Sequence, residues 1–458
     1  MAIFGSSLFG FLIAVAILVT IHELGHYLAA RWCGVKVLRF SVGFGPVLVK
    51  WMGKRGIFKG TEFAVSALPL GGYVRMLDLR DPECAAVKSS VGEAAFNTRP
   101  LWQRSVIVAA GPLANFVLAA VLYAFALAAP DRDLTALIAT PEASTPAAES
   151  GLRGGEKILR MNDRAVAHWG DVRWELLTSL FQPELTLEVE SRGVEKTYVL
   201  QRKTEDVGAG AASVGARLSG WGLGFDQPAV IGNVKAAGPA ETAGLREGDR
   251  VVAVQDIPVR QWSQFTAAIR VAPGQLVRLA VERGGSRQDI VVTPRKDTVN
   301  GQTIGRIDVA AISALKLGET WVVDRERSLP ESSVAAVRRT IDATTLTVRV
   351  LWGMLTGEVS LRQISGPITM AEGAGVTLNQ GAVAFTLFLA IVSVSIGVLN
   401  LLPVPMLDGG QLLYHLLEAL KGAPLSERAE AFGQRIGIGF VTALTALALY
   451  NDFLRIIS

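Results

Sequence analysis

The feature that most constrains this chain is a set of long apolar runs that contain no charged side chain. The first extends from Met1 to Ile21 and the second from Ser105 to Ala129. A third runs from Gly373 to Leu407, and a shorter fourth, 436–451, follows Arg435, whose long side chain can reach toward the membrane surface. Because roughly 20 apolar residues suffice to cross a bilayer as a helix, the sequence predicts four transmembrane helices.

Basic residues predict the orientation of these helices. The segment 31–104 holds more Lys and Arg than Asp and Glu, and loops of this kind remain in the cytoplasm. Residues 130–370 are then expected to face outward, and the loop 408–435 to face inward. The net charge of +4 follows from this asymmetry and gives no case for nucleic-acid binding. Both cysteines fall in the cytoplasmic loop, where thiols stay reduced, so a disulfide framework is not expected.

The outward segment contains a repeat. The stretch TPAAESGLRGGEKILRMNDRAV (145–166) aligns without a gap on GPAETAGLREGDRVVAVQDIPV (238–259), and Trp169 then corresponds to Trp262. A spacing of about 90 residues is too long for a solenoid unit and suits a small domain. The Gly-, Ala- and Ser-rich stretch 204–220 is expected to join the two copies. Both copies resemble PDZ domains, an α+β family that binds extended peptides by adding a strand to a sheet edge.

The second copy carries the sequence GLGF. The PDZ resemblance assigns the loop that receives a peptide's carboxyl terminus to Gly222, Leu223, Gly224 and Phe225. The alternative is that both copies only fold and block access sterically, and the sequence leaves the two open. Farther along, apolar residues recur at helical spacing over 332–361. This pattern indicates an amphipathic helix on the outer membrane surface, or a helix packed on a soluble domain.

The first apolar run ends in IHELGHYLAARWC (21–33), which contains two histidines four residues apart. On a helix His22 and His26 share one face and can hold one metal ion, while Glu23 can reach a water on that metal. Zinc suits such a site and lowers the pKa of bound water, so that a carboxylate can accept the proton as the water attacks a carbonyl carbon. Polar residues at membrane depth are costly and usually functional.

A closed catalytic site needs a third protein ligand, for which Asp408 is the strongest candidate. It is the first acid after the third apolar run, in NLLPVPMLDGG (400–410). Since the first and third spans both run inward, Asp408 and His22 should lie at the same depth. The prolines before Asp408 are expected to break the helix, and the two glycines after it to free the backbone. Cys33 remains an alternative ligand, His168 lies on the wrong side, and a simple helix-capping role for Asp408 also stays open.

The HELGH motif, the paired PDZ-like copies and the N-x-x-P-x-P-x-L-D-G motif together resemble the site-2 protease family of intramembrane zinc metalloproteases. The resemblance covers essentially the whole chain. It implies one zinc ion per chain, with His22, His26 and Asp408 as ligands and Glu23 as the general base. It gives Asn400 a substrate-binding or oxyanion-stabilising role.

Two further stretches match the family. The stretch FAVSALPLGGYVRM (63–76) resembles a β-hairpin that dips into the membrane from the cytoplasmic side. Its edge is expected to hold substrate by main-chain hydrogen bonds, with Leu70, Gly71 and Gly72 in the turn. Because a helix hides its peptide bonds, the substrate must be extended before cleavage. Asn115, in the GPLANF motif of the second span, is expected to pack or to hydrogen-bond to another helix.

The resemblance implies hydrolysis of a peptide bond within the transmembrane segment of single-span membrane proteins. These would be an anti-sigma factor of an envelope stress response, already trimmed on its outer side, and remnant signal peptides. It also implies a multi-pass protein of the bacterial inner membrane, periplasmic PDZ domains, an active site near the cytoplasmic side and no required oligomer. A non-catalytic PDZ scaffold that binds exported peptides, and a zincin acting on soluble cytoplasmic peptides, are the alternatives.

The expected architecture is a polytopic α-helical membrane protein with two tandem α+β PDZ-like domains between the second and third spans. Its expected segments are helix 1–30, cytoplasmic loop 31–100 with the hairpin, helix 101–129, PDZ-like domains 130–220 and 221–310, membrane-surface segment 311–372, helix 373–407, cytoplasmic loop 408–435 and helix 436–458.

Overall fold

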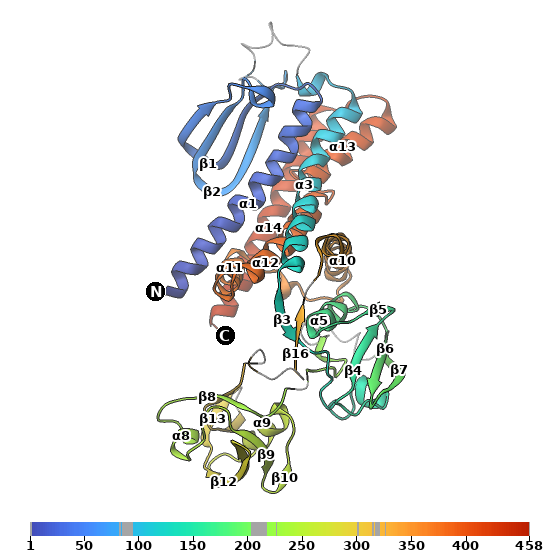
Figure 1. Cartoon of the computed structure of the whole chain (residues 1–458). Helices are drawn as coiled ribbons and strands as arrows, with labels where there is room; N and C mark the ends of the chain where they lie inside the picture. The colour runs from blue at the N-terminus through green and yellow to red at the C-terminus, as the bar shows by residue number, and fades with distance from the viewer. Residues whose placement is uncertain are drawn as a thin grey trace. The chain divides into compact units, whose positions relative to one another are not determined.

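In the described part of the chain, four helices are long and apolar enough to cross a membrane, which confirms the number predicted from the apolar runs. They are α1 (Ala2–Trp32), α3 (Leu101–Ala128), α12 (Ala382–Asn400) and α14 (Glu427–Ile457) (Figure 1). Contacts divide the chain into a membrane unit, residues 1–129 with 326–458, and an inserted unit, residues 130–325. The computed structural model describes residues 2–81, 84, 95–202, 218–225, 227–299, 302–313, 316, 321–325 and 327–457.

Helix α3 is central to the membrane unit, because it packs against α1, α12 and α10 (Leu329–Thr356). Small residues permit the close approach of these helices. A Cβ on Gly25 of α1, for example, would lie only 2.3 Å from the carbonyl oxygen of Ala110 in α3. Large apolar side chains are exposed on the outside of the helices, among them Phe125 and Phe432, each 66% exposed. Contact with lipid accounts for this exposure.

Two expected boundaries in the membrane unit are corrected by the structure. The third apolar run forms two helices, because α11 (Pro367–Gln380) ends at Gly381, whose φ of 116° favours glycine, before α12 begins. The expected loop 408–435 is largely helical, since α13 (Asp408–Lys421) fills its first part and α14 begins at Glu427. Hydropathy alone missed α13 because one of its faces is polar.

Strands β1 (Val37–Met52) and β2 (Glu62–Met76) follow α1, and each bends so that the pair forms a sheet of four segments. Segment 37–42 pairs with 72–76 on one side and with 62–65 on the other, while 47–52 pairs with 62–66. Segments 72–76 and 47–52 are therefore the edges of this sheet. Exposed apolar side chains such as Leu48, 66% exposed, support the expected contact of the hairpin with lipid. Short 3₁₀ helices lie at Gly56–Phe58 and Phe96–Thr98.

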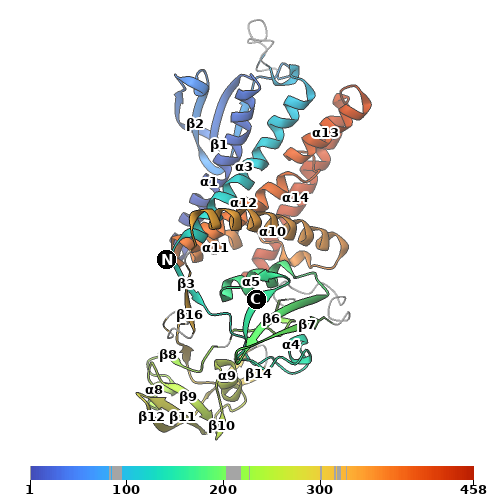
Figure 2. The ribbon, with the colours of Figure 1, turned by 45° about the vertical axis from the view of Figure 1, so that its right-hand side comes forward.

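Helix α10 (Leu329–Thr356) begins at a capping box formed by Ser328 and Glu331. Its buried face carries small residues and packs on α3 and α12, whereas the predicted apolar stripe is exposed, with Val334 and Trp352 each 64% exposed. Figure 2 shows α10 lying across the direction of α3. An exposed apolar stripe on a helix that crosses the transmembrane helices supports a position at the membrane surface. A short 3₁₀ helix, Leu361–Gln363, follows.

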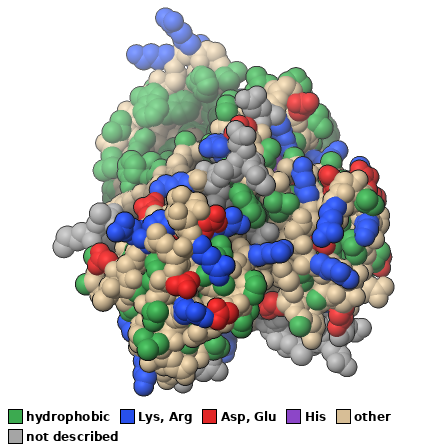
Figure 3. All heavy atoms as spheres, turned by 60° about the horizontal axis from the view of Figure 1, so that its bottom comes forward, with side chains coloured by type: hydrophobic (Ala, Val, Ile, Leu, Met, Phe, Trp, Pro, Cys, Tyr) green, Lys and Arg blue, Asp and Glu red, His purple; other side chains and the backbone are tan. Residues whose placement is uncertain are grey.

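The inserted unit contains two copies of one fold, in agreement with the repeat in the sequence. Each copy has a four-stranded sheet, with strand orders β5-β4-β6-β7 and β10-β9-β11-β12. The face seen in Figure 3 carries Lys, Arg, Asp and Glu side chains interspersed among uncharged ones. The first copy comprises α4 (Pro146–Glu149), β4 (Lys157–Met161), β5 (Arg164–Ala165), α5 (Trp169–Thr178), β6 (Glu184–Ser191) and β7 (Val194–Gln201). The second comprises α8 (Pro239–Thr242), β9 (Arg250–Val254), β10 (Ile257–Pro258), α9 (Trp262–Arg270), β11 (Val277–Arg283) and β12 (Ser286–Val292), followed by the hairpin β13 (Arg295–Val299) and β14 (Gln302–Arg306).

A buried carboxylate occupies the same turn in both copies. Glu156 accepts a hydrogen bond of 3.1 Å from the backbone N–H of Arg153, and Asp249 accepts one of 2.8 Å from that of Arg246. Asp249 also receives two hydrogen bonds, of 2.6 and 2.7 Å, from the guanidinium of Arg283, and Glu156 has no such arginine among the described residues. Burial alone would raise the pKa of Asp249, but these hydrogen bonds outweigh burial and lower it.

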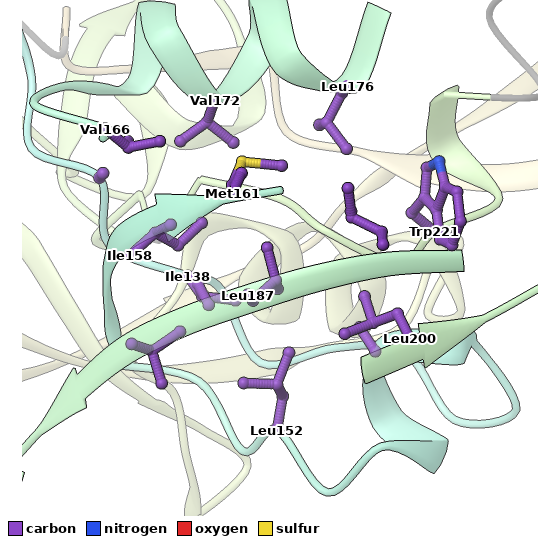
Figure 4. Packing of buried hydrophobic residues seen from close by; sticks show 14 of the residues in the cluster. Ile138, Leu152, Ile158, Met161, Val166, Val172, Leu176, Leu187, Leu200 and Trp221 are labelled. Carbon is purple, nitrogen blue, oxygen red and sulfur yellow. The ribbon is translucent and has the colours of Figure 1, made fainter. Parts of the chain in front are cut away.

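The boundary between the copies differs from the expectation that GLGF (222–225) opens the second copy. The carbonyl oxygen of Gly224 instead accepts a hydrogen bond of 2.8 Å from the backbone N–H of Ala139 in the first copy. Trp221 is fully buried in the apolar cluster of the first copy, which Figure 4 shows. The segment that begins at Trp221 therefore completes the first copy.

The second copy has its own closing segment. Strand β15 (Val309–Ala311) pairs with β8 (Ile231–Val234). Asp308, with a φ of 58°, precedes β15 much as Gly222, with a φ of 73°, precedes the rest of GLGF. Each copy is thus closed by a segment at its C-terminal end, which a local alignment of the repeat could not reveal. Most of the expected joining stretch, residues 204–217, lies outside the described residues.

The chain enters and leaves the inserted unit through a two-stranded ribbon. Strand β3 (Asp131–Leu134) pairs antiparallel with β16 (Val322–Arg325), and Leu134 lies opposite Val322.

Candidate metal centre

Two histidines of α1 and one aspartate at the start of α13 meet inside the membrane unit. The Nε2 atoms of His22 and His26 lie 3.2 Å apart. Oδ2 of Asp408 lies 3.2 Å from Nε2 of His22 and 3.4 Å from Nε2 of His26. All three side chains are nearly buried, at 11 to 14% exposed. Among the described residues, this is the one group of at least three His, Cys, Asp or Glu whose ligand atoms lie close enough to hold a metal ion.

The spacing of these three atoms fits a zinc ion. Around a tetrahedral zinc with bonds of about 2.0–2.1 Å, neighbouring ligand atoms lie about 3.3 Å apart. The three distances in the structure agree with this value. Two imidazoles and a carboxylate are also a donor set that zinc accepts, and three protein ligands leave the fourth position for water or substrate, as a catalytic site requires.

The turn after α12 delivers Asp408 to the histidines. Helix α12 ends at Asn400, and Met406 adopts a φ of 97°, which few residues other than glycine accept. A conformation of this kind costs on the order of 1–3 kcal/mol and is found mainly where a site requires it. Helix α13 then begins at Asp408, so the backbone direction changes immediately before the ligand.

The two glycines after Asp408 were expected to free the backbone, but they allow close packing beside the ligands instead. Gly409 and Gly410 lie in the first turn of α13 and do not have a positive φ. A Cβ on either would lie 2.3 Å from a backbone carbonyl oxygen of the preceding turn, so both allow close packing rather than backbone freedom. In α3, a Cβ on Gly111 would lie 2.2 Å from Nε2 of His26.

The outer nitrogens of both imidazoles contact α3. Nδ1 of His26 donates a hydrogen bond of 2.9 Å to the carbonyl oxygen of Ile107. The amide of Asn115, which is fully buried, lies 3.2 Å from Nδ1 of His22. The backbone carbonyl of Asn115 accepts a hydrogen bond of 2.8 Å from Ser393 of α12. Sequence reasoning did not anticipate the roles of Ile107, Gly111 or Ser393, and it left the partner of Asn115 unnamed.

Glu23 lies between these ligands and the edge of the β-hairpin. Its carboxylate accepts a hydrogen bond from the backbone of Val74 in β2. A Cβ on Gly72 would lie 3.2 Å from Cγ of Glu23, so the strand approaches the carboxylate closely. Gly71, with a φ of 143°, turns the chain into this edge. The side chain of Leu70 lies outside the described residues.

The other two candidate ligands lie elsewhere. Cys33 packs in an apolar cluster with Tyr27, and His168 belongs to the inserted unit, where its Nδ1 lies 2.9 Å from Oδ2 of Asp133. Asn400 is half-buried at the end of α12.

The inserted unit also contains a groove that the sequence did not predict. It has a volume of about 1250 Å³ and lies in the second copy, between α9 and residues 303–310. Lys235 and Arg270 contribute positive charge to its lining. The GLGF residues belong to the first copy and do not line this groove.

The sequence matches the profile of peptidase family M50 over residues 10–444. It is 36% identical to the regulator of sigma E protease of Salmonella typhi over 98% of this chain and 99% of the relative. It is 35% identical to the regulator of sigma-E protease RseP of Escherichia coli (strain K12) over 97% and 98% of the two chains. A protein of Neisseria meningitidis whose name describes a zinc metalloprotease is 36% identical over 98% and 99%.

Proposed function

This chain belongs to peptidase family M50 and is an intramembrane zinc metalloprotease of the site-2 type, and we propose that His22, His26 and Asp408 hold its zinc ion. The observation that carries this proposal is the approach of three ligand atoms to within 3.2–3.4 Å of one another, from two helices far apart in the sequence. All three proposed ligands come from one chain, and we propose that catalysis needs no second copy.

We propose that Glu23 is the general base. When bound, zinc supplies a Lewis acid that polarises a carbonyl group and lowers the pKa of a water molecule. Glu23 is the next residue after His22 and projects between the ligands and β2, so its carboxylate can take the proton of the attacking water and pass it to the leaving nitrogen. Asn400, at the end of α12, can donate its amide N–H to the developing oxyanion.

The edge of the β-hairpin is proposed to hold the substrate. Segment 72–76 pairs on one side only, and its Val74 contacts Glu23 directly. A strand added to the free side of this edge would be extended, with its peptide bonds accessible, beside the general base. Leu70, Gly71 and Gly72 lie at the start of this edge, where glycine permits close approach of another backbone.

The protein is a multi-pass protein of the bacterial inner membrane. We propose that the segment 31–100 and α13 face the cytoplasm, because Lys and Arg exceed Asp and Glu between the first two spans. Since α1 then runs inward and ends at Trp32, His22 and His26 lie in its inner part. The inserted unit would face the periplasm.

The relatives are named as regulators of sigma E. We propose that this chain likewise cleaves a single-span membrane protein that controls an envelope stress response, with remnant signal peptides as further substrates. A non-catalytic scaffold is not favoured, because the chain retains the two histidines, the glutamate and the aspartate that the chemistry requires, and the side chains of the two histidines and the aspartate meet.

We propose that the two copies in the inserted unit are PDZ-like domains. Each has a four-stranded sheet, a helix between its second and third strands, and a closing segment at its end. If one copy binds a peptide, the groove beside α9 favours the second, because Lys235 and Arg270 can attract a carboxyl terminus there. The alternative is that the two copies bind no peptide and exclude bulky substrates sterically, and removal of the inserted unit distinguishes the two roles.

Zinc content and cleavage together test the active site. Full-length protein in detergent should carry one zinc per chain, His22→Ala should lose it, and His168→Ala, which removes a histidine of the inserted unit, should keep it. Glu23→Gln should keep zinc and fold but lose cleavage of a single-span substrate in membrane vesicles, because an amide preserves shape and cannot accept the proton. Cleavage by Glu23→Gln within about tenfold of wild type would remove the role of general base, which contributes roughly 10²–10⁴-fold.

A further inference from the structure

Asn115 is a fully buried polar residue in the second membrane span. The end of its side-chain amide that lies 3.2 Å from Nδ1 of His22 is placed as Nδ2, and the far end as Oδ1. The far end of the amide has no hydrogen-bond partner among the described residues. Burying an amide is costly unless it is hydrogen-bonded, and in a membrane helix such a residue is usually functional. The contact with His22 is therefore the interaction that accounts for this side chain.

The chemistry of imidazole determines which end of the amide faces His22. For His26 the state is clear, because a carbonyl oxygen can only accept: Nδ1 carries the proton toward Ile107, and Nε2 keeps its lone pair for a metal. His22 needs the same tautomer to present Nε2, and therefore needs an acceptor at Nδ1. The two ends of an asparagine amide have the same shape, and only Oδ1 accepts. With the NH₂ end toward Nδ1, the proton of His22 would sit on the nitrogen that must bind the metal.

We propose that Asn115 is a positioning residue, whose Oδ1 accepts a hydrogen bond from Nδ1–H of His22 and thereby holds Nε2 ready to bind zinc. This proposal rests on the proposed ligand set. A single face of α3 then serves both histidines, because Ile107, Gly111 and Asn115 follow one another at intervals of four residues, like His22 and His26 on α1. Ile107 orients His26, Gly111 gives it space, and Asn115 orients His22.

Asn115 is itself held in place from α12. The hydroxyl of Ser393, fully buried, donates to the backbone carbonyl of Asn115 at 2.8 Å. This bond fixes the backbone of α3 at the depth of the metal ligands, and it leaves the side chain of Asn115 free to face α1. Helices α1, α3 and α12 therefore meet at this residue.

The test is the zinc dissociation constant of full-length protein in detergent, measured by competition with a chelator. Asn115→Leu keeps the size of the side chain and removes the acceptor, and should weaken zinc binding by about 10–100-fold, the usual effect of losing an outer partner of a ligand. Asn115→Asp restores an acceptor and should stay within about threefold of wild type. Thr340→Ala is the control, because it removes a buried side-chain hydrogen bond, of 2.9 Å to the carbonyl oxygen of Ala336, in α10, a helix that carries none of the proposed ligands, and it should bind zinc like wild type.

A second measurement reads the tautomer directly, without metal. Nitrogen-15 NMR of histidine-labelled, zinc-free protein distinguishes Nδ1–H from Nε2–H imidazole, and with four histidines in the chain the His22 signals can be assigned from a His22→Gln sample. We expect His22 to be the Nδ1–H tautomer in wild type and in Asn115→Asp, and a mixture in Asn115→Leu.

The outcomes separate this proposal from the one on which it rests. Zinc binding that His22→Ala leaves unchanged would overturn both the ligand set and the role of Asn115. Zinc binding that His22→Ala abolishes but Asn115→Leu leaves unchanged would overturn the role of Asn115 alone. Equal loss of zinc in Asn115→Leu and Asn115→Asp, with an unaltered tautomer, would mean that Asn115 only packs.

Discussion

Replacing Gly111 with alanine should disable the metal site while leaving the fold intact. The added Cβ would lie 2.2 Å from Nε2 of His26, whereas carbon atoms in contact normally stay about 3.5 Å or more from their neighbours. The imidazole must therefore move by about 1.3 Å. It cannot do so freely, because its Nδ1 is bonded to Ile107 and its Nε2 faces Asp408.

Metal sites tolerate displacements of only about 0.2 Å in ligand distance. A shift several times larger should weaken zinc binding by at least about 100-fold, or about 2.7 kcal/mol. The matched control is Gly439→Ala in α14, where a Cβ meets no atom within 4 Å and the helix should be slightly stabilised. The assay is zinc per chain after dialysis, with circular dichroism to confirm that helix content is kept. Wild-type zinc retention by Gly111→Ala would refute the packing argument.

Further predictions concern the third ligand, the inserted unit and the substrate. Asp408→Asn should weaken zinc binding and nearly abolish cleavage, because a neutral amide is a poorer ligand; retained zinc and activity would transfer the third-ligand role elsewhere. Asp249→Asn should destabilise the second copy by about 1.5–3 kcal/mol at pH 7, since it removes the buried carboxylate of an ion pair and leaves the partly exposed guanidinium of Arg283 without its partner. Hydrogen exchange of the full-length protein would measure this, and Glu156→Gln, at the matching position and without an arginine partner among the described residues, should have a clearly smaller effect. Folding lowers the pKa of Asp249, so the stability that its charge contributes is complete above the unfolded pKa of about 3.9 and is lost as pH falls through the lower folded pKa. Protection factors of the second copy that depend on pH in the same way in wild type and Asp249→Asn would contradict this. Replacing residues 135–321 with an Asn-Gly turn would join β3 directly to β16. If the inserted unit excludes bulky proteins, this change should allow cleavage of an untrimmed substrate. If the unit instead captures a carboxyl terminus, the change should lower cleavage of the trimmed substrate. Raising helix propensity around the cleavage point of a substrate should slow cleavage, and indifference to such changes would remove the argument that the substrate unwinds.

Much of the membrane unit could be predicted because its signals are local. Charge-free runs identify spans by themselves, and the HELGH sequence puts two imidazoles on one helix face wherever the helix packs. To predict that Asp408 lies at the depth of the two histidines, the direction in which each span crosses the membrane was also needed, and the basic residues of the loops supplied it. By contrast, α13 escaped prediction because its polar face hides it from a hydropathy criterion.

What sequence reasoning missed depends on contacts between distant segments. Gly111 looks like any small residue of a membrane helix, and only its position opposite His26 explains it. Asn115 did offer a signal, as the single amide in an uncharged span, but its partner on α1 could not be read from one sequence. The GLGF segment was assigned to the wrong copy because the chain order suggests that a domain begins there, whereas packing around Trp221 closes the preceding one.

The ribbon of β3 and β16 makes the size of the insertion almost irrelevant to the protease that carries it. Because Leu134 and Val322 are partners, the two ends of nearly two hundred residues are held together locally, and the entropy of closing that loop is borne by the insertion itself. Evolution could therefore lengthen, duplicate or exchange this part of the chain without retuning the helices around the metal. The tandem repeat is the kind of change that such an attachment tolerates, and a fluorescent protein or a foreign binding domain with neighbouring termini could be grafted at the same point.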